Sequence, residues 1–281
     1  MSISMDLIKE LRHKTGIGIG ECKKALAESG GDLEEAIAFL RKKGLATAVK
    51  KEGREANEGK IGYASSNDAV AIVEINSETD FVVQNQMFQE FVENIANEVV
   101  NAKPESLEAF LQQPYSKDPS LTVEEYRAVM VQTIGENIQI KRFHVFPKDS
   151  NHSIGVYSHL GGKIVTVVNV EGSDKEETLA KEIAMHAAAT SPEYLKPEEV
   201  PQDIVESERN IAKEQIKGKP ENIIEKILDG KIKAYYDQVC LTCQKFIRDD
   251  KLTISEVVNT RGKEAGKALS LTQFTRWKVG E

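Results

Sequence analysis

Apolar residues recur three and four positions apart between Met5 and Lys43, which is the spacing of amphipathic helices. Local signals divide this stretch into three short helices. In chain order, these signals are Gly16 after the first helix, Gly30 and Gly31 after the second, and Asp32 with Glu35 before the third, which Gly44 would end. The pattern predicts a three-helix bundle near the lower size limit for independent folding.

A strand–turn–strand–helix pattern then occurs twice, beyond a small and charged linker at 46–60. The first copy has strands at 61–63 and 70–75 and a helix at 86–100, and the second has strands at 154–157 and 164–170 and a helix at 175–189. Both copies predict helices laid over antiparallel strands, so the core should contain two related α+β subdomains.

The other segments complete an α+β fold. We expect a loop or short helix at 101–121, a helix capped by Thr122 and Glu125, a strand at 138–146, and more sheet at 240–281 with a strand at 274–279. Residues 204–237 carry one narrow apolar seam, broken at Gly218-Lys219-Pro220, which predicts an antiparallel helical hairpin. The expected domains are the bundle and linker helix at 1–54, one core subdomain at 55–150, a second at 151–203 and 238–281, and the hairpin at 204–237.

Charge and hydropathy narrow the class of protein. The 281 residues carry a formal net charge of -8, which argues against nucleic-acid binding because phosphate contacts need a basic face. No apolar run approaches the roughly 18 residues of a membrane span, and the first residues open an amphipathic helix instead of a signal peptide. An odd count of 3 cysteines suits a reducing compartment. We therefore expect a cytoplasmic protein that binds neither membrane nor nucleic acid.

Two stretches imitate known chemical motifs. Cys240 and Cys243 form a C-x-x-C pair, but a zinc ribbon needs a second pair, and we interpret them as buried or half-buried thiols. The run GIGIG at 16–20 resembles a phosphate loop, yet a helix and not a strand precedes it. We interpret it as a tight interhelical turn that exposes Ile17 and Ile19. The sequence shows no catalytic signature and no histidine spacing typical of a metal site.

The stretch SETDFV at 77–82 raises a sharper question, because it sets Asp80 and Phe81 side by side directly after a buried run. One interpretation is that Phe81 packs in its own core while Asp80 caps the next helix. The other is that both side chains are held out for a partner. The residues alone favour the first interpretation, since an aromatic side chain is more often buried than exposed.

Several stretches together resemble the bacterial elongation factor Ts family. They are TGIGIGECKKALAESGGDLEEAIAFLRKKG at 15–44, SETDFV at 77–82, IGENIQIKR at 134–142, IAMHAAATSPEYL at 183–195 and the G-K-P hairpin at 218–220, in the family's order. The resemblance implies a ubiquitin-associated-like bundle, a core of two related subdomains and a protruding coiled coil. It also implies guanine nucleotide exchange on elongation factor Tu, bound in its GDP and nucleotide-free states, without a cofactor and without catalysis of a chemical reaction.

The resemblance also implies contact residues. Thr79, Asp80, Phe81 and Val82 correspond to the family segment that enters the GTPase near its magnesium site, and their expected effect is to displace that ion. The other corresponding contacts are Arg12, Ile17, Ile19 and Lys23 in the bundle, and His186. With the resemblance, the second interpretation of Asp80 and Phe81 becomes the favoured one.

The sequence departs from the family in two places. The further helix that some members carry after the V-G-E segment does not follow Glu281, and Val83-Gln84-Asn85 lacks a basic residue often found there. We therefore expect neither the contact from that helix nor a salt bridge from that position. A general protein-interaction module and a thiol enzyme based on Cys240 and Cys243 remain alternatives.

Overall fold

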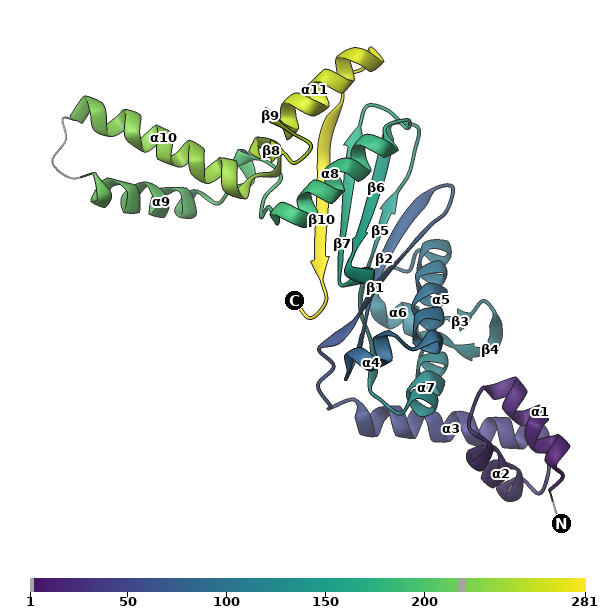
Figure 1. Ribbon diagram of the computed structural model, residues 1–281. Helices are drawn as coiled ribbons and strands as arrows, with labels where there is room; N and C mark the ends of the chain where they lie inside the picture. The colour runs from purple at the N-terminus through teal and green to yellow at the C-terminus, as the bar shows by residue number, and fades with distance from the viewer. Residues whose placement is uncertain (1–2, 217–220) are drawn as a thin grey trace. The chain divides into compact units, whose positions relative to one another are not determined.

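The computed structural model describes residues 3–216 and 221–281, and the predicted break at 218–220 lies outside them (Figure 1). The chain divides into two compact units. Unit 1 consists of Met1–Pro147 and Lys278–Glu281, and unit 2 consists of Lys148–Trp277. Mixed helix and antiparallel strand in both units confirm the α+β class.

The N-terminal bundle contains α1 (Met5–Thr15), α2 (Ile19–Glu28) and α3 (Leu33–Lys51). Gly16 follows α1 with φ 68°, a left-handed conformation that glycine adopts without strain. The side chain of Asp32 accepts the Glu35 N–H at 2.8 Å and caps α3, as the sequence predicts. The bundle core includes Leu11, Cys22, Leu26 and Leu40.

Helix α3 does not end at Gly44, so that prediction is wrong. It continues to Lys51, and Gly44 lies where α3 packs on α7 (Val123–Ile134). A Cβ on Gly44 would lie 3.1 Å from Gln132 Oε1. The glycine therefore allows a close approach of the two helices, and Ala48 on the next turn joins the core of the α+β part of unit 1.

The sheet of unit 1 has the strand order β1-β2-β5, with antiparallel pairing throughout. Helix α5 packs on β1 and β2, and every residue of β2 is buried. The strands are β1 (Glu58–Ser65), β2 (Ala69–Ser77) and β5 (Ile138–Pro147). The remaining elements are α4 (Asp80–Val83), α5 (Gln86–Ala102), α6 (Leu107–Gln112) and the small hairpin of β3 (Pro114–Tyr115) and β4 (Asp118–Thr122).

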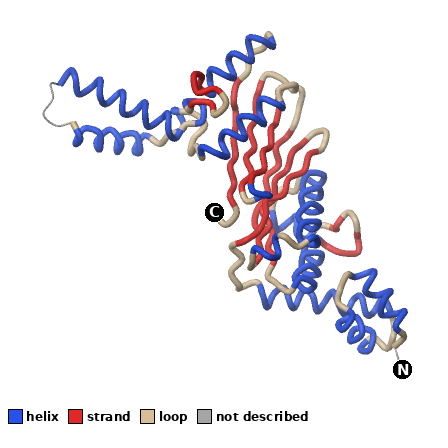
Figure 2. The backbone as a smooth tube through the Cα atoms, in the orientation of Figure 1, coloured by secondary structure: helices blue, strands red, loops and turns tan. Residues whose placement is uncertain are grey.

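The sheet of unit 2 has the order β10-β7-β6, and α8 packs on β6 and β7 (Figure 2). The strands are β6 (His152–His159), β7 (Ile164–Glu171) and β10 (Ser270–Lys278), and the helices are α8 (Glu177–Thr190) and α11 (Ile254–Ala265). A second small hairpin pairs β8 (Lys245–Phe246) with β9 (Asp249–Thr253). Short 3-10 turns lie at η1 (Leu160–Gly162), η2 (Pro197–Glu199) and η3 (Leu241–Cys243).

The internal repeat is real and longer than the sequence pattern indicates. In each unit the third strand pairs with the second, and a small hairpin and a helix precede that third strand. The helix after each hairpin starts with a capping box, Thr122 with Glu125 and Thr253 with Glu256. The second of these helices, α11, lies in the segment predicted to supply sheet, so that prediction missed a helix.

The predicted helical hairpin consists of α9 (Gln202–Gln215) and α10 (Glu221–Val239), which pack against each other. Ala212, Ile216 and Leu228 are buried between them, whereas Ile211 is exposed. None of the helices described is long and apolar enough to cross a bilayer.

Candidate functional site

A turn after β2 presents the acid and the aromatic ring that the sequence singles out. Thr79 is the N-cap of the one-turn helix α4, and Asp80 is its first residue. The Phe81 side chain is 84% exposed, whereas Val82 is buried in the core of unit 1. Successive side chains on a helix point about 100° apart, so burial of Val82 turns Phe81 outward. The interpretation of Phe81 as a core residue is therefore wrong, and so is that of Asp80 as the cap, because Thr79 caps α4.

Two reciprocal carboxylate contacts hold this turn. Glu136 accepts the Thr79 N–H at 3.0 Å and the Thr79 hydroxyl at 2.7 Å. In return, the Asn137 N–H donates to Glu78 at 2.6 Å. The pairing of β2 with β5 brings these segments together, since its last register pair joins Ser77 to Ile138. The turn is thus fixed by hydrogen bonds on one side and by the core on the other.

The predicted bundle contacts separate into exposed and buried residues. Arg12, Ile19 and Lys23 are exposed, with Ile19 at 44%. Ile19 and Lys23 are four residues apart on α2 and therefore share one face. Ile17 is buried in the bundle core, so the expectation that the GIGIG turn exposes both isoleucines is wrong for Ile17.

His186 is 0% exposed and bonds within its own unit. Its Nδ1 accepts the Ile247 N–H at 3.3 Å, so its Nε2 carries the proton that is donated to Gln244 Oε1 at 3.0 Å. Burial lowers the pKa of His186, against an opposing effect of the Gln244 bond, and favours this neutral imidazole. Ile247, between β8 and β9, donates its N–H to His186 and has an exposed side chain. Sequence patterns did not identify Ile247 as a candidate contact.

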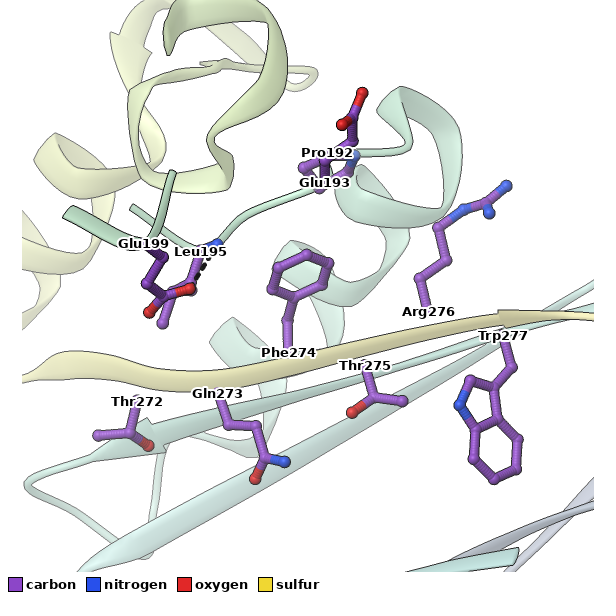
Figure 3. Close-up of a pocket in the computed structure, with 10 residues that line it drawn as sticks. All are labelled: Pro192, Glu193, Leu195, Glu199, Thr272, Gln273, Phe274, Thr275, Arg276 and Trp277. Atoms are coloured by element: carbon purple, nitrogen blue, oxygen red, sulfur yellow. Dashed lines mark hydrogen bonds between the residues drawn. The ribbon is translucent and has the colours of Figure 1, made fainter. Parts of the chain in front are cut away.

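Unit 2 also has a cavity of about 530 Å³ beside strand β10 (Figure 3). Phe274 points from the strand toward the segment that holds Leu195, whose N–H donates to Glu199 at 3.1 Å, while Trp277 lies on the other side of the strand. None of the contact residues predicted from the sequence lines this cavity.

The cysteines carry no sign of an activated thiol. All three cysteines are free, and burial raises the pKa of Cys240 to about 12 and also raises the pKa of Cys243. A thiol with a raised pKa is a poor nucleophile near neutral pH. Within residues 3–216 and 221–281, no group of histidines, cysteines and acids has the arrangement of a metal site.

The sequence is similar to that of known proteins along nearly its whole length. A family model described as elongation factor TS matches residues 78–281. The chain is 60% identical over 280 residues to Elongation factor Ts of Protochlamydia amoebophila (strain UWE25), covering 100% of this chain and 99% of that protein. It is 47% identical over 277 residues to Elongation factor Ts of Chlamydia muridarum (strain MoPn / Nigg), covering 99% and 98%.

The family model and these relatives define the class as an elongation factor of protein biosynthesis. Within that class the family model covers most of the chain, and the two relatives cover nearly all of it. The chain belongs to the elongation factor Ts family.

Proposed function

We propose that this protein binds elongation factor Tu in its GDP complex in the cytoplasm and promotes GDP release, so that GTP can bind during translation elongation. Family membership supports the exchange role. The main structural support for the mechanism is the turn after β2, which Glu136 holds through Thr79. In this turn Phe81 is 84% exposed, and Asp80 beside it is also exposed.

Phe81 is the residue we assign to wedge into the GTPase. Burying a phenylalanine side chain contributes about 1.5–3 kcal/mol, and an exposed ring leaves that free energy for a partner surface. Well-packed aromatic anchors dominate many interfaces. Thr79 and Val82 belong to the same site because they hold the ring in place. Thr79 does so through its contact with Glu136, and Val82 through its burial in the core.

Asp80 is the residue we assign to disturb the magnesium ion of the GTPase. Mg²⁺ keeps several water ligands in strict octahedral geometry and is sensitive to the groups that orient those waters. A carboxylate brought beside this shell competes for those groups. Displacement of the ion then removes the positive charge that compensates the diphosphate, and GDP leaves more readily.

The energetic requirement matches these two residues. A factor that weakens nucleotide binding is itself weakened by nucleotide to the same degree, so it must bind the empty GTPase most tightly. Accelerating release about ten-thousandfold takes roughly 5.5 kcal/mol, at about 1.36 kcal/mol per tenfold step. One aromatic anchor together with the loss of magnesium coordination is of that order.

Two further surfaces complete the proposed interface. In the bundle, Arg12, Ile19 and Lys23 form the second contact, and Ile17 supports it from the bundle core. In unit 2, His186 belongs to the interface through the β8–β9 turn that it holds, where Ile247 is exposed.

Release of a fluorescent GDP analogue from elongation factor Tu, with and without this protein, tests the proposal. We expect the release rate to rise with the concentration of the protein and to saturate. A general interaction module would bind without accelerating release, and that result would refute the exchange function. A thiol enzyme would lose activity on substitution of Cys240 and Cys243, whereas we expect exchange to continue.

A further inference from the structure

We propose that Glu136 is a positioning residue for Phe81: its carboxylate fixes Thr79 and thereby sets the direction in which the ring leaves the surface. The inference rests on the proposed exchange function. It adds a residue that lies outside the SETDFV segment and 55 positions beyond Phe81 in the sequence. Sequence reasoning did not assign Glu136 any role.

Little else holds the ring. Helix α4 has four residues, fewer than the length at which a helix is stable alone, and its N-cap makes no side-chain capping bond. Phe81 is 84% exposed and therefore has few packing contacts of its own. Its direction depends on the segments that flank it, which are the buried pair Val82 and Val83 on one side and Thr79 on the other.

Thr79 makes two contacts to the Glu136 carboxylate, and its carbonyl also accepts the Ser77 hydroxyl at 3.1 Å. The Thr79 N–H lies 3.0 Å from Glu136 Oε2, and the Thr79 hydroxyl lies 2.7 Å from Glu136 Oε1. Hydrogen bonds to an ionised acceptor are stronger than those between neutral groups. One bond involves the backbone of Thr79 and the other its side chain, so together they restrict both.

Glu136 is itself held in place. It lies between Gly135, which ends α7 with φ 89°, and Asn137, whose N–H donates to Glu78 at 2.6 Å. The Asn137 side chain donates to the Glu52 carbonyl at 3.3 Å and to the Arg54 carbonyl at 2.8 Å. Removal of the Glu136 carboxylate should therefore free the N–H and the hydroxyl of Thr79, while the Ser77 bond to its carbonyl and the surrounding turn stay in place.

Loss of this contact should weaken exchange more than it weakens folding. A freely moving ring must be ordered when it enters the partner, and that ordering opposes binding. We expect Glu136→Ala to slow GDP release about tenfold, which corresponds to about 1.4 kcal/mol. Glu136→Gln keeps one acceptor oxygen and an amide that can donate to the Thr79 hydroxyl, so it should restore most of the rate.

Glu125 provides a matched control. Its carboxylate accepts the Thr122 N–H at 2.7 Å in the capping box of α7, which is the same type of contact away from Phe81. We expect Glu125→Ala to lower thermal stability and to leave the exchange rate within about twofold of the wild type. The isosteric Thr79→Val removes the hydroxyl bond alone and serves if Glu136→Ala fails to fold.

A second readout follows the ring directly in the free protein. With 4-fluorophenylalanine incorporated at position 81, the fluorine NMR signal should narrow in Glu136→Ala and in Thr79→Val, but not in Glu125→Ala. Unchanged exchange and an unchanged fluorine signal in the folded Glu136→Ala protein would overturn the inference, as would failure of Glu136→Gln to restore the rate. If the wild type itself does not accelerate GDP release, the proposed function fails, and the fluorine signal alone decides the positioning role.

Discussion

His186 accepts the Ile247 N–H through Nδ1 at 3.3 Å and thereby closes the β8–β9 turn from the buried face of α8. The equivalent position in unit 1 is occupied by Glu98 on α5, which accepts the Ser116 N–H at 3.3 Å in the β3–β4 turn. Each turn residue directly follows a two-residue strand. The internal repeat therefore assigns His186 a structural task that a carboxylate performs in the other copy.

This arrangement predicts that acid destabilises unit 2. Burial lowers the pKa of His186 in the folded state, so the unfolded chain takes up a proton first as the pH falls. The stabilisation from neutral His186 is complete above the unfolded value, about 6.5, and is lost as the pH drops below it. We expect the thermal midpoint to fall between about pH 7 and about pH 5.5, and to fall less in His186→Gln.

His144 provides the control, because burial lowers its pKa as well. For each histidine, the change of the thermal midpoint with pH is compared between the wild type and the glutamine variant. The difference between these two slopes is the contribution of that histidine. Equal slopes in the wild type and His186→Gln would contradict the prediction.

The exposed turn predicts a loss of function without a loss of stability. Phe81→Ala and Asp80→Ala each alter an exposed side chain, so the free energy of unfolding should change by less than about 0.5 kcal/mol. Truncation of an aromatic anchor typically costs about 2 kcal/mol or more in binding, so stopped-flow GDP release should slow by roughly thirtyfold in Phe81→Ala. Tyr63→Ala, at an aromatic residue 51% exposed on β1, should retain the wild-type rate.

Equal release rates in Phe81→Ala and the wild type would remove the ring from the mechanism. Equal slowing in Phe81→Ala and Tyr63→Ala would indicate a general effect of exposed aromatic residues instead of a site.

The bundle surface is best tested by point substitution. Deletion of residues 1–50 would remove most of α3, and Ala48 on that helix is part of the core of the α+β part of unit 1. Ile19→Ala leaves the core intact, and we expect it to weaken the complex with elongation factor Tu by about 1 kcal/mol, or roughly fivefold, by calorimetry. Val49→Ala, at a residue 68% exposed on α3, is the control. Unchanged affinity in Ile19→Ala would exclude that side chain from the interface.

Sequence patterns predicted the elements that have strong periodicity or a cap. The helix expected at 86–100 is α5, Gln86–Ala102, and Thr122 with Glu125 caps α7 as predicted. Helix α11 is the exception: Thr253 and Glu256 carry the same capping signal, and the buried Ile254 and Val258 are four residues apart, yet the segment was predicted as sheet. The end of α3 was misplaced because a glycine that allows helix packing looks the same in sequence as one that ends a helix.

The residues of the candidate site could be predicted only in part from the sequence, for a similar reason. Asp80 and Phe81 are adjacent in sequence, but Glu136 meets Thr79 only because β2 and β5 pair. Ile17 and Ile19 are two residues apart and look equivalent, yet the start of α2 buries one and exposes the other. Such differences depend on contacts between distant residues, which local patterns do not specify.

Alanine substitutions at the glycines of β6 and β1, the first strands of the two sheets, should destabilise the protein by different amounts. On β6, a Cβ at Gly155 would lie 2.1 Å from the Lys181 nitrogen, which is backbone of α8. On β1, a Cβ at Gly62 would lie 2.5 Å from Val92 Cγ1, which is side chain of α5. A side-chain methyl can move more readily than a helix backbone, so Gly155→Ala should be the more destabilising change. We expect losses above about 3 kcal/mol for Gly155→Ala and about 1–3 kcal/mol for Gly62→Ala in urea unfolding.

Gly230→Ala is the matched control for these two substitutions. Gly230 lies within α10, and a Cβ there meets no atom within 4 Å. Alanine is the better helix former by about 1 kcal/mol, so this variant should be slightly more stable than the wild type. Because one obstacle is backbone and the other is mainly side chain, the order of stability should be Gly230→Ala, then Gly62→Ala, then Gly155→Ala. Equal urea midpoints for Gly62→Ala and Gly155→Ala would show that α8 can move away from β6 as easily as Val92 can turn.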